Sequence, residues 1–201
     1  MFNERLSAFN ACLTQCAVSG ASPVRSVTDG LRNAASLLRA VQQAQGIVYV
    51  IGNGGSAGIA SHFASDLLKA LHVPAQTLYD SNLMTCLSND LGYENVFSIP
   101  LSKLLKPHDA LVAISSSGKS PNILRAAEVA IQKQAAVITL SGFASTNPLR
   151  AQGQLNFWIN ATDYGLIESA HFFLLHSLVD LWHKLGNTHV ENDRTFAHSQ
   201  N

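Results

Sequence analysis

Glycine and hydroxyl groups follow a short apolar run near residue 50 of this 201-residue chain. Ile51 is followed by Gly-Asn-Gly-Gly-Ser, and residues 57–68 then have a helical pattern. Glycines let the backbone approach a ligand closely, and a helix N-terminus offers unpaired N–H groups to an anion. The spacing matches neither the P-loop nor the dinucleotide-binding fingerprint. This corner favours a phosphorylated small molecule over a nucleotide, and the alternative is a tight turn that needs glycine only for its dihedral angles.

A second polar corner follows the apolar run at 110–114. It reads Ser115-Ser-Ser-Gly-Lys-Ser120, and Pro121 then begins a predicted helix. Hydroxyl and backbone donors at a helix N-terminus suit phosphate oxygens, whereas the simpler alternative is a serine-rich helix cap. Two such corners, each after a predicted parallel strand, favour a phosphate site.

Imidazole and carboxylate groups form a third set, on two predicted helices. His62 and Asp66 are four residues apart, and Glu168 and His176 are eight apart, so each pair shares one helix face. Such groups serve as acid and base, or as ligands of a divalent metal. Spacing alone leaves both roles open.

The elements that must position these groups alternate along the chain. Apolar runs predict five strands, at 47–51, 75–79, 110–114, 135–140 and 155–159. Amphipathic patterns predict helices between them, at 56–71, 82–91, 122–133 and 166–185. Strands rich in Val, Ile and Leu are typical of a parallel sheet that is buried on both faces. We therefore expect an open, mostly parallel α/β sheet flanked by helices, with ligands at the carboxyl ends of its strands.

Three regions follow from this pattern. Residues 1–45 predict two antiparallel helices with a break at 19–23, and their apolar stripes predict a role in oligomer packing. Residues 46–186 form the predicted α/β domain. Residues 187–201 are polar and aperiodic, which predicts a frayed tail.

Composition narrows the class of protein. The 13 basic and 13 acidic residues cancel and form no basic run, which argues against a nucleic-acid partner. Charged residues make up only 13%, which indicates either surface covered by other subunits or an uncharged polar surface. No apolar stretch reaches the ~18 residues of a membrane span, and the N-terminus lacks a signal-peptide pattern. The three cysteines form no disulfide framework, so we expect a cytoplasmic protein with no membrane partner.

Four motifs in order resemble the sugar isomerase (SIS) fold and, within it, the phosphoheptose isomerase family. They cover roughly residues 25–185 and are Gly52-Asn-Gly-Gly-Ser56 with Ser61-His-Phe-Ala-Ser-Asp66, Leu87-Ser-Asn-Asp-Leu-Gly-Tyr93, Ile114-Ser-Ser-Ser-Gly-Lys-Ser120, and Glu168 with His176. The resemblance implies a five-stranded SIS domain in a homotetramer, with active sites at subunit boundaries. It implies conversion of D-sedoheptulose 7-phosphate to D-glycero-D-manno-heptose 7-phosphate, for bacterial surface sugars such as lipopolysaccharide, capsule or S-layer glycan.

The resemblance also implies residue roles. Asn53 and Asp90 would contact the sugar, and Asp66 and His176 would be the base and acid, with Glu168 as a third catalytic and substrate-binding group. Residues that would bind the phosphate end are Gly54, Ser56, Ser115, Ser116, Ser117 and Ser120. Residues at zinc-binding positions are His62, Asp66, Glu168 and His176.

This chain departs from the family pattern at four positions. The family usually has Glu at Asp66, often Gln at Glu168, commonly His at Ala57 and Asn at Lys119. These departures leave open the heptose product, and whether Asp66 or Glu168 is the base. The alternative is a non-catalytic SIS scaffold that binds the replication initiator protein. Such a scaffold should lose the acid–base set, which this chain keeps, so the sequence favours an enzyme.

Overall fold

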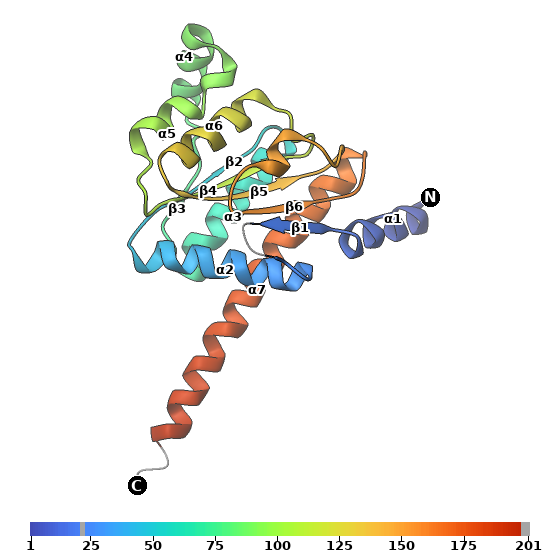
Figure 1. Cartoon of the computed structure of the whole chain (residues 1–201), viewed down its shortest axis with the longest axis vertical. Coiled ribbons are helices and arrows are strands. Elements are labelled where there is room, and N and C mark those ends of the chain that lie inside the picture. Colours follow the sequence, from blue (N-terminus) through green and yellow to red (C-terminus); the bar gives the residue numbers. More distant parts are fainter. Residues whose placement is uncertain (21–22, 198–201) are drawn as a thin grey trace.

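A six-stranded sheet with helices on both faces forms the body of the protein (Figure 1). The computed structural model describes residues 1–20 and 23–197, with side chains as far as residue 184. The strands are β1 (Ala17–Gly20), β2 (Val48–Ile51), β3 (Ala75–Gln76), β4 (Ala110–Ser115), β5 (Ala136–Ser141) and β6 (Leu155–Trp158). Their order in the sheet is β1-β6-β5-β4-β2-β3, and all neighbours are parallel except the antiparallel pair β1 and β6.

The predicted α/β sheet is confirmed, with one strand more than the five expected. The sixth strand, β1, lies at the start of the region where the sequence predicted only a break between helices. Its four residues pair with β6, with Val18 opposite Phe157 and Ser19 opposite Asn156. A partly exposed edge strand of this length carries no hydrophobic pattern that the sequence could show.

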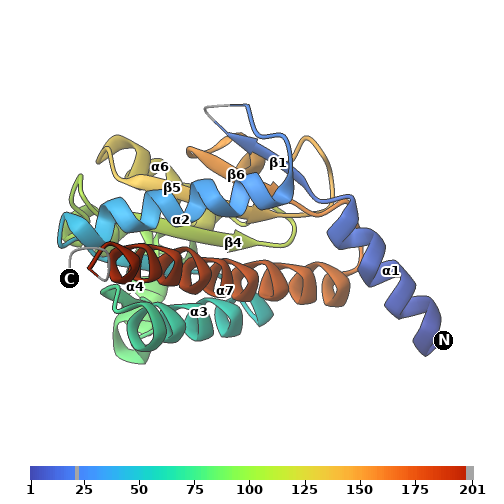
Figure 2. The ribbon, with the colours of Figure 1, turned by 90° about the horizontal axis from the view of Figure 1, so that it is seen from below.

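Two layers of helices cover the sheet. On one face lie α2 (Val27–Gln43), α3 (Gly55–Leu71) and α7 (Tyr164–Ala197), which run side by side in Figure 2. On the other face lie α5 (Ser98–Leu104) and α6 (Pro121–Gln132). Alternate strand residues supply the two cores, so Val112 faces α3 and α7 while Leu111 faces α5 and α6. The remaining elements are α4 (Ser81–Leu91) and the short 3₁₀ helices η1 (Tyr93–Asn95) and η2 (Pro148–Ala151).

The N-terminal helices differ from the expected antiparallel pair. Helix α1 (Phe2–Thr14) projects from the body, and α1 and α2 each pack against α7 rather than against each other (Figure 2). The intervening strand β1 separates them. Helix α7 also continues to Ala197, through most of the segment predicted to be a frayed tail. No helix in the described part of the chain is long and apolar enough to cross a membrane.

Strands β2 and β4 determine where the two polar corners meet. They are adjacent and parallel, with Ile51 opposite Ala113. The glycine turn, residues 52–56, therefore leaves the same edge of the sheet as the serine loop, which we define as residues 115–120. The turn leads into α3, and the serine loop leads into α6, where Pro121 occupies the first turn. The carboxyl ends of central strands are the usual ligand position in such sheets.

Candidate active site

The glycine turn and the serine loop line one pocket of about 280 Å³, which we call the serine pocket. The start of α7 closes its third side with Tyr164 and Glu168. The pocket brings together eight of the residues singled out from the sequence, namely Asn53, Gly54, Ser56, Ser115, Ser116, Ser117, Ser120 and Glu168. These residues come from three separate segments of the chain. The site is therefore formed by the fold, and no single sequence motif supplies it.

Hydrogen bonds hold the glycine turn in place. The Gly52 N–H donates to the Tyr79 hydroxyl at 2.7 Å, and that hydroxyl donates to the Gly52 carbonyl at 3.0 Å. Burial raises the pKa of Tyr79, so the phenol stays protonated. Asn53 exchanges two bonds of 2.9 Å with Asn122 and accepts one from Tyr93. Gly54 has a φ of +54°, a conformation that favours glycine.

The serine loop turns sharply at Gly118, whose φ is +63°. Its N–H donates to the Ser115 carbonyl at 2.9 Å, and its carbonyl accepts from the Leu149 N–H at 3.1 Å. A Cβ at this position would overlap Asn147 Oδ1, so only glycine fits. Ser115 and Ser120 share a hydrogen bond of 3.2 Å between their hydroxyls. These contacts fix the shape of the loop, and four of its serines line the pocket.

Ser116, in the serine loop, has a buried hydroxyl group without a hydrogen-bond partner in the part of the chain that the structure describes. Its side chain is 5% exposed, and its Oγ atom has no hydrogen-bond partner among the described residues. A buried hydroxyl without a partner costs about 1–3 kcal/mol. An anion bound in the pocket would offer the acceptor that this hydroxyl lacks.

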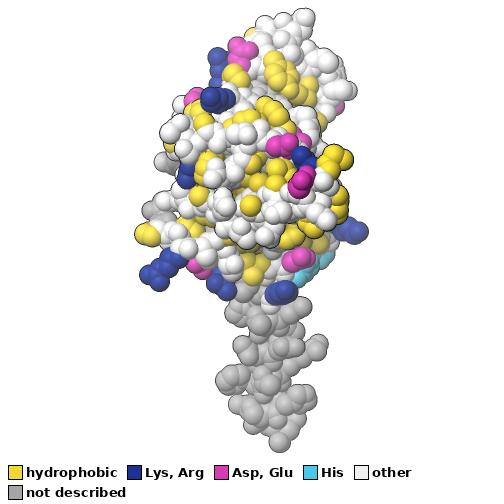
Figure 3. All heavy atoms as spheres, turned by 90° about the vertical axis from the view of Figure 1, so that its right-hand side faces the viewer, with side chains coloured by type: hydrophobic (Ala, Val, Ile, Leu, Met, Phe, Trp, Pro, Cys, Tyr) yellow, Lys and Arg dark blue, Asp and Glu magenta, His cyan; other side chains and the backbone are white. Residues whose placement is uncertain are grey.

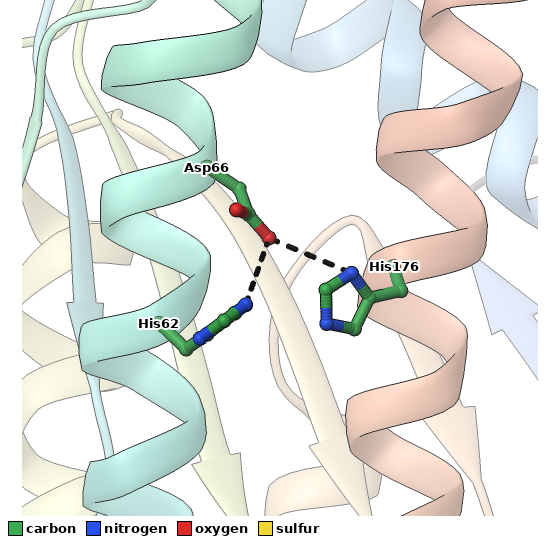
Figure 4. Close-up of side chains that lie close together, drawn as sticks. All are labelled: His62, Asp66 and His176. Atoms are coloured by element: carbon green, nitrogen blue, oxygen red, sulfur yellow. Dashed lines mark ion pairs between the residues drawn. The ribbon is translucent and has the colours of Figure 1, made fainter.

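His62, Asp66 and His176 meet in the seam between α3 and α7, where Figure 4 shows both imidazoles directed at the same carboxylate oxygen. Asp66 Oδ2 lies 3.4 Å from His62 Nε2 and 3.6 Å from His176 Nδ1. The Phe172 ring makes T-shaped contacts with both imidazoles. All three side chains are partly exposed, so a ligand can reach them.

The geometry of this triad fits a metal ion. One potential ligand atom from each residue lies within 4.8 Å of the others. Two ligands of a tetrahedral zinc with bonds of ~2.0–2.2 Å are roughly 3.4 Å apart, close to the two separations involving Asp66. Two imidazoles and one carboxylate are also the ligand set of several catalytic zinc sites, which keep the fourth position open.

Glu168 does not join this triad. Its carboxylate lies in the serine pocket against Gly55, at the N-terminus of α3, where a Cβ on Gly55 would overlap it. That position places a negative charge at the positive end of the helix dipole. The structure therefore brings together three of the four residues at zinc-binding positions and places the fourth beside the serine loop.

Asp90 lies outside the serine pocket of its own chain. It is on α4, which stands away from the sheet (Figure 1), and it accepts hydrogen bonds from Asn89 at 2.8 Å and from the Cys86 thiol at 3.6 Å. Sequence reasoning missed Tyr164 and Asn122. Tyr164 is the first residue of α7 and 58% exposed, so no periodic pattern marks it. Asn122 directly follows the serine loop, which is the one signal that could have indicated it.

His171 lies on α7 between Glu168 and His176 but faces the sheet. It is fully buried, and Nε2 lies 3.1 Å from the Ser141 carbonyl. Burial lowers the pKa of its imidazole to about 4, against a weaker opposing effect of that hydrogen bond. The ring is therefore neutral at pH 7 and donates through Nε2–H, which makes it a packing residue rather than a proton carrier.

The chain is similar in sequence and in structure to proteins of one family. The SIS domain matches residues 21–142. The phosphoheptose isomerase of Alkalilimnicola ehrlichii is 34% identical over 78% of this chain and 84% of that protein, and the one of Helicobacter hepaticus is 33% identical over 92% and 96%. Among solved structures, phosphoheptose isomerases from Neisseria gonorrhoeae and Francisella tularensis each superpose with a TM-score of 0.78 at 26% identity. They cover 90% and 91% of this chain, which spans 94% and 96% of theirs.

Proposed function

Since the chain belongs to the phosphoheptose isomerase family of SIS-domain proteins, we propose that it converts D-sedoheptulose 7-phosphate to D-glycero-D-manno-heptose 7-phosphate. One observation carries the proposal: the serine pocket and the His62–Asp66–His176 triad lie along the same seam between α3 and α7. The first suits a phosphate and the second suits proton transfer. A non-catalytic scaffold would have no need of the triad.

The spacing of the two parts matches the length of the substrate. Glu168 lines the serine pocket and His176 belongs to the triad, and eight residues of helix separate them by about 12 Å. An extended seven-carbon chain with a terminal phosphate spans roughly 10 Å at ordinary bond lengths. With the phosphate among the serine hydroxyls, the carbonyl end would reach the triad.

The reaction moves one proton between neighbouring carbons. A base removes a proton from C1 of the ketose, which gives an enediol, and a proton is then delivered to C2 while the hydroxyl proton passes from O1 to O2. Both imidazoles approach Asp66 at Oδ2, so Oδ1 is left to take the carbon-bound proton. We assign Asp66 as the base and His176 as the group that moves the hydroxyl proton. Holding the phosphate fixes the reacting carbons beside them.

We assign His62, Asp66 and His176 as the residues that would hold zinc, one ion per subunit. Bound there, the ion would supply Lewis-acid polarisation of the sugar carbonyl. Glu168 is assigned to the substrate instead, because its carboxylate lies in the serine pocket. Asn53 lines that pocket and would contact the sugar hydroxyls.

The proposal includes a homotetramer. Large apolar side chains remain exposed on α1, α3 and α7: Phe2 at 78%, Leu6 at 55%, Leu68 at 52% and Phe173 at 52%. Figure 3 shows hydrophobic side chains gathered on the side from which α1 projects. Closed symmetric assembly is the usual way to bury such a surface. In that assembly, Asp90 on the projecting α4 would contact sugar in a neighbouring subunit's site.

A cytoplasmic location and a role in bacterial surface-sugar synthesis complete the proposal, and both rest on the family resemblance. The direct test is incubation of the purified protein with sedoheptulose 7-phosphate, with and without zinc. An aldoheptose 7-phosphate product supports the proposal, and an unreacted substrate under both conditions contradicts it.

A further inference from the structure

A second polar pocket, of about 520 Å³, lies at the β1 edge of the sheet. It is bounded by β1, β6 and η2, shares no lining residue with the serine pocket and takes no part in the proposed reaction. Its polar lining consists of Ser19, Ser145, Thr146, Asn147, Arg150 and Asn156. We call it the edge pocket. It contains a cation and several hydroxyl groups but no carboxylate.

Asn156 gives the floor of the edge pocket an unsatisfied acceptor. It lies opposite Ser19 across the β1–β6 pair, so both side chains are on the same face of the sheet. Its Nδ2 donates to Thr139 Oγ1 at 2.8 Å, whereas its Oδ1 has no partner within the part of the chain that the structure describes. The residue is only 2% exposed. A ligand that carries hydroxyl donors would supply the missing hydrogen bond.

Arg150 gives the wall of the pocket an oriented cation. Its guanidinium carbon lies 4.5 Å from the centre of the Trp158 ring, and Nη1 donates to the Ser145 carbonyl at 2.9 Å. Its own backbone N–H is held by Asn147 Oδ1 at 3.0 Å. A guanidinium fixed in this way loses little entropy on binding, and its remaining N–H groups match a phosphate. Ser145 and Thr146 line the pocket together with Arg150.

From these contacts we infer that the edge pocket is a second small-molecule site, which binds a sugar phosphate. The phosphate contacts Arg150 and the neighbouring hydroxyls of the pocket, and a sugar hydroxyl donates to Asn156 Oδ1. A neutral sugar lacks the anion that Arg150 recognises, and inorganic phosphate lacks the sugar hydroxyls that would reach Asn156 while the phosphate contacts Arg150. This inference is independent of the proposed isomerase activity, because it uses none of the same residues.

Trp158 provides a direct test, since the chain has only two tryptophans. In a Trp182→Phe background, Trp158 is the sole tryptophan, and its emission reports on Arg150. Glucose 6-phosphate should change that emission with saturation, inorganic phosphate should bind more weakly, and glucose should have no effect. Arg150→Gln should raise the dissociation constant for glucose 6-phosphate by at least about tenfold.

Two controls separate the edge pocket from other sites. Arg32→Gln removes the same charge from an exposed ion pair with Asp29 and should leave the binding unchanged. Ser116→Ala, in the serine pocket, should also leave the Trp158 response unchanged. If Trp182→Phe does not fold, calorimetry of the Ser116→Ala protein, with and without Arg150→Gln, replaces the fluorescence. No saturable binding at millimolar sugar phosphate, or binding that Ser116→Ala abolishes and Arg150→Gln preserves, would overturn the inference.

Discussion

Asp66 Oδ2 lies 3.6 Å from Nδ1 of His176, which joins the first helix after the glycine turn to the last helix of the chain. Because His62 also approaches the same oxygen, one carboxylate organises two imidazoles in the seam between α3 and α7 (Figure 4). The two helices extend from this point toward the serine pocket. We therefore expect changes at the triad and changes at the serine pocket to have separate effects.

Loss of one triad imidazole should remove the metal. We expect His62→Ala to lower the zinc affinity by more than the roughly 10–100-fold typical of changes to groups that only hydrogen-bond to a metal ligand, because it deletes a ligand itself. Zinc content after dialysis, measured by mass spectrometry, gives the readout. His183→Ala, an exposed histidine elsewhere on α7, is the matched control. A His62→Ala protein that retains stoichiometric zinc, or a native protein that binds none after add-back, would contradict the metal assignment.

Removal of the Ser116 hydroxyl should weaken substrate binding without harming the fold. One charge-assisted hydrogen bond contributes about 1.5–3 kcal/mol, so Ser116→Ala should raise KM by roughly tenfold to a hundredfold. Stability should be unchanged or slightly higher, because the hydroxyl is buried without a partner. Ser102→Ala, on α5 and bonded only within its own helix, should leave KM unchanged. An unaltered KM in Ser116→Ala would place the phosphate elsewhere.

A charge on the exposed face of α7 should disrupt assembly. We expect the native protein to have about four times the 21.5 kDa mass of one chain by light scattering. Phe173→Asp should lower that mass, since Phe173 is 52% exposed and contacts the Phe9 ring of the projecting α1. Ile131→Asp, on α6 and 45% exposed, is the control. A native protein that is an active monomer at micromolar concentration would refute the composite assembly.

The buried His171 should make stability depend on pH. Its pKa is lowered to about 4 in the folded protein from 6.5, so the unfolded chain binds more protons between these values. The contribution of His171 to stability is therefore present above pH 6.5 and is lost as the pH drops toward 4. Linkage gives a loss of about 2 kcal/mol from pH 7 to pH 5. His171→Gln should lack this part of the pH dependence in denaturant unfolding, whereas the exposed-site control His183→Gln should retain it. Equal slopes for His171→Gln and the native protein would show that His171 titrates normally.

The sequence predicted the parts of this fold that periodic patterns encode. Buried parallel strands and the two corners after β2 and β4 leave continuous apolar runs followed by glycine or serine, and the structure confirms the sheet. Strand β1 was not predicted, because it forms only by pairing with β6, which lies far along the chain. The separation of α1 from α2 likewise depends on α7, which the local pattern of neither helix reveals.

The candidate site, too, could be predicted only as far as local sequence spacing allows. His62 and Asp66 are one helical turn apart, so spacing places them on one helix face, and in the structure their side chains lie 3.4 Å apart. Glu168 and His176 share a face but are about 12 Å apart along the axis, so the directions of their side chains decide whether both reach one ion. The spacing of residues along a helix shows which face each side chain occupies. It does not show which residues of a neighbouring helix lie at the same level. The structure resolves this by setting Glu168 beside Gly55 and His176 beside Asp66.

The most direct test of the account is turnover of sedoheptulose 7-phosphate by the native protein and by Asp66→Asn, followed by NMR of the product. We expect the native protein to form the aldoheptose 7-phosphate, and kcat of Asp66→Asn to fall by about 10²–10⁴-fold with KM little changed, because the proton acceptor is lost while the serine pocket is intact. Asp180→Asn, an exposed carboxylate on α7, should retain native turnover. Native kcat in Asp66→Asn, or no product from the native protein in the presence of zinc, would contradict the central claim.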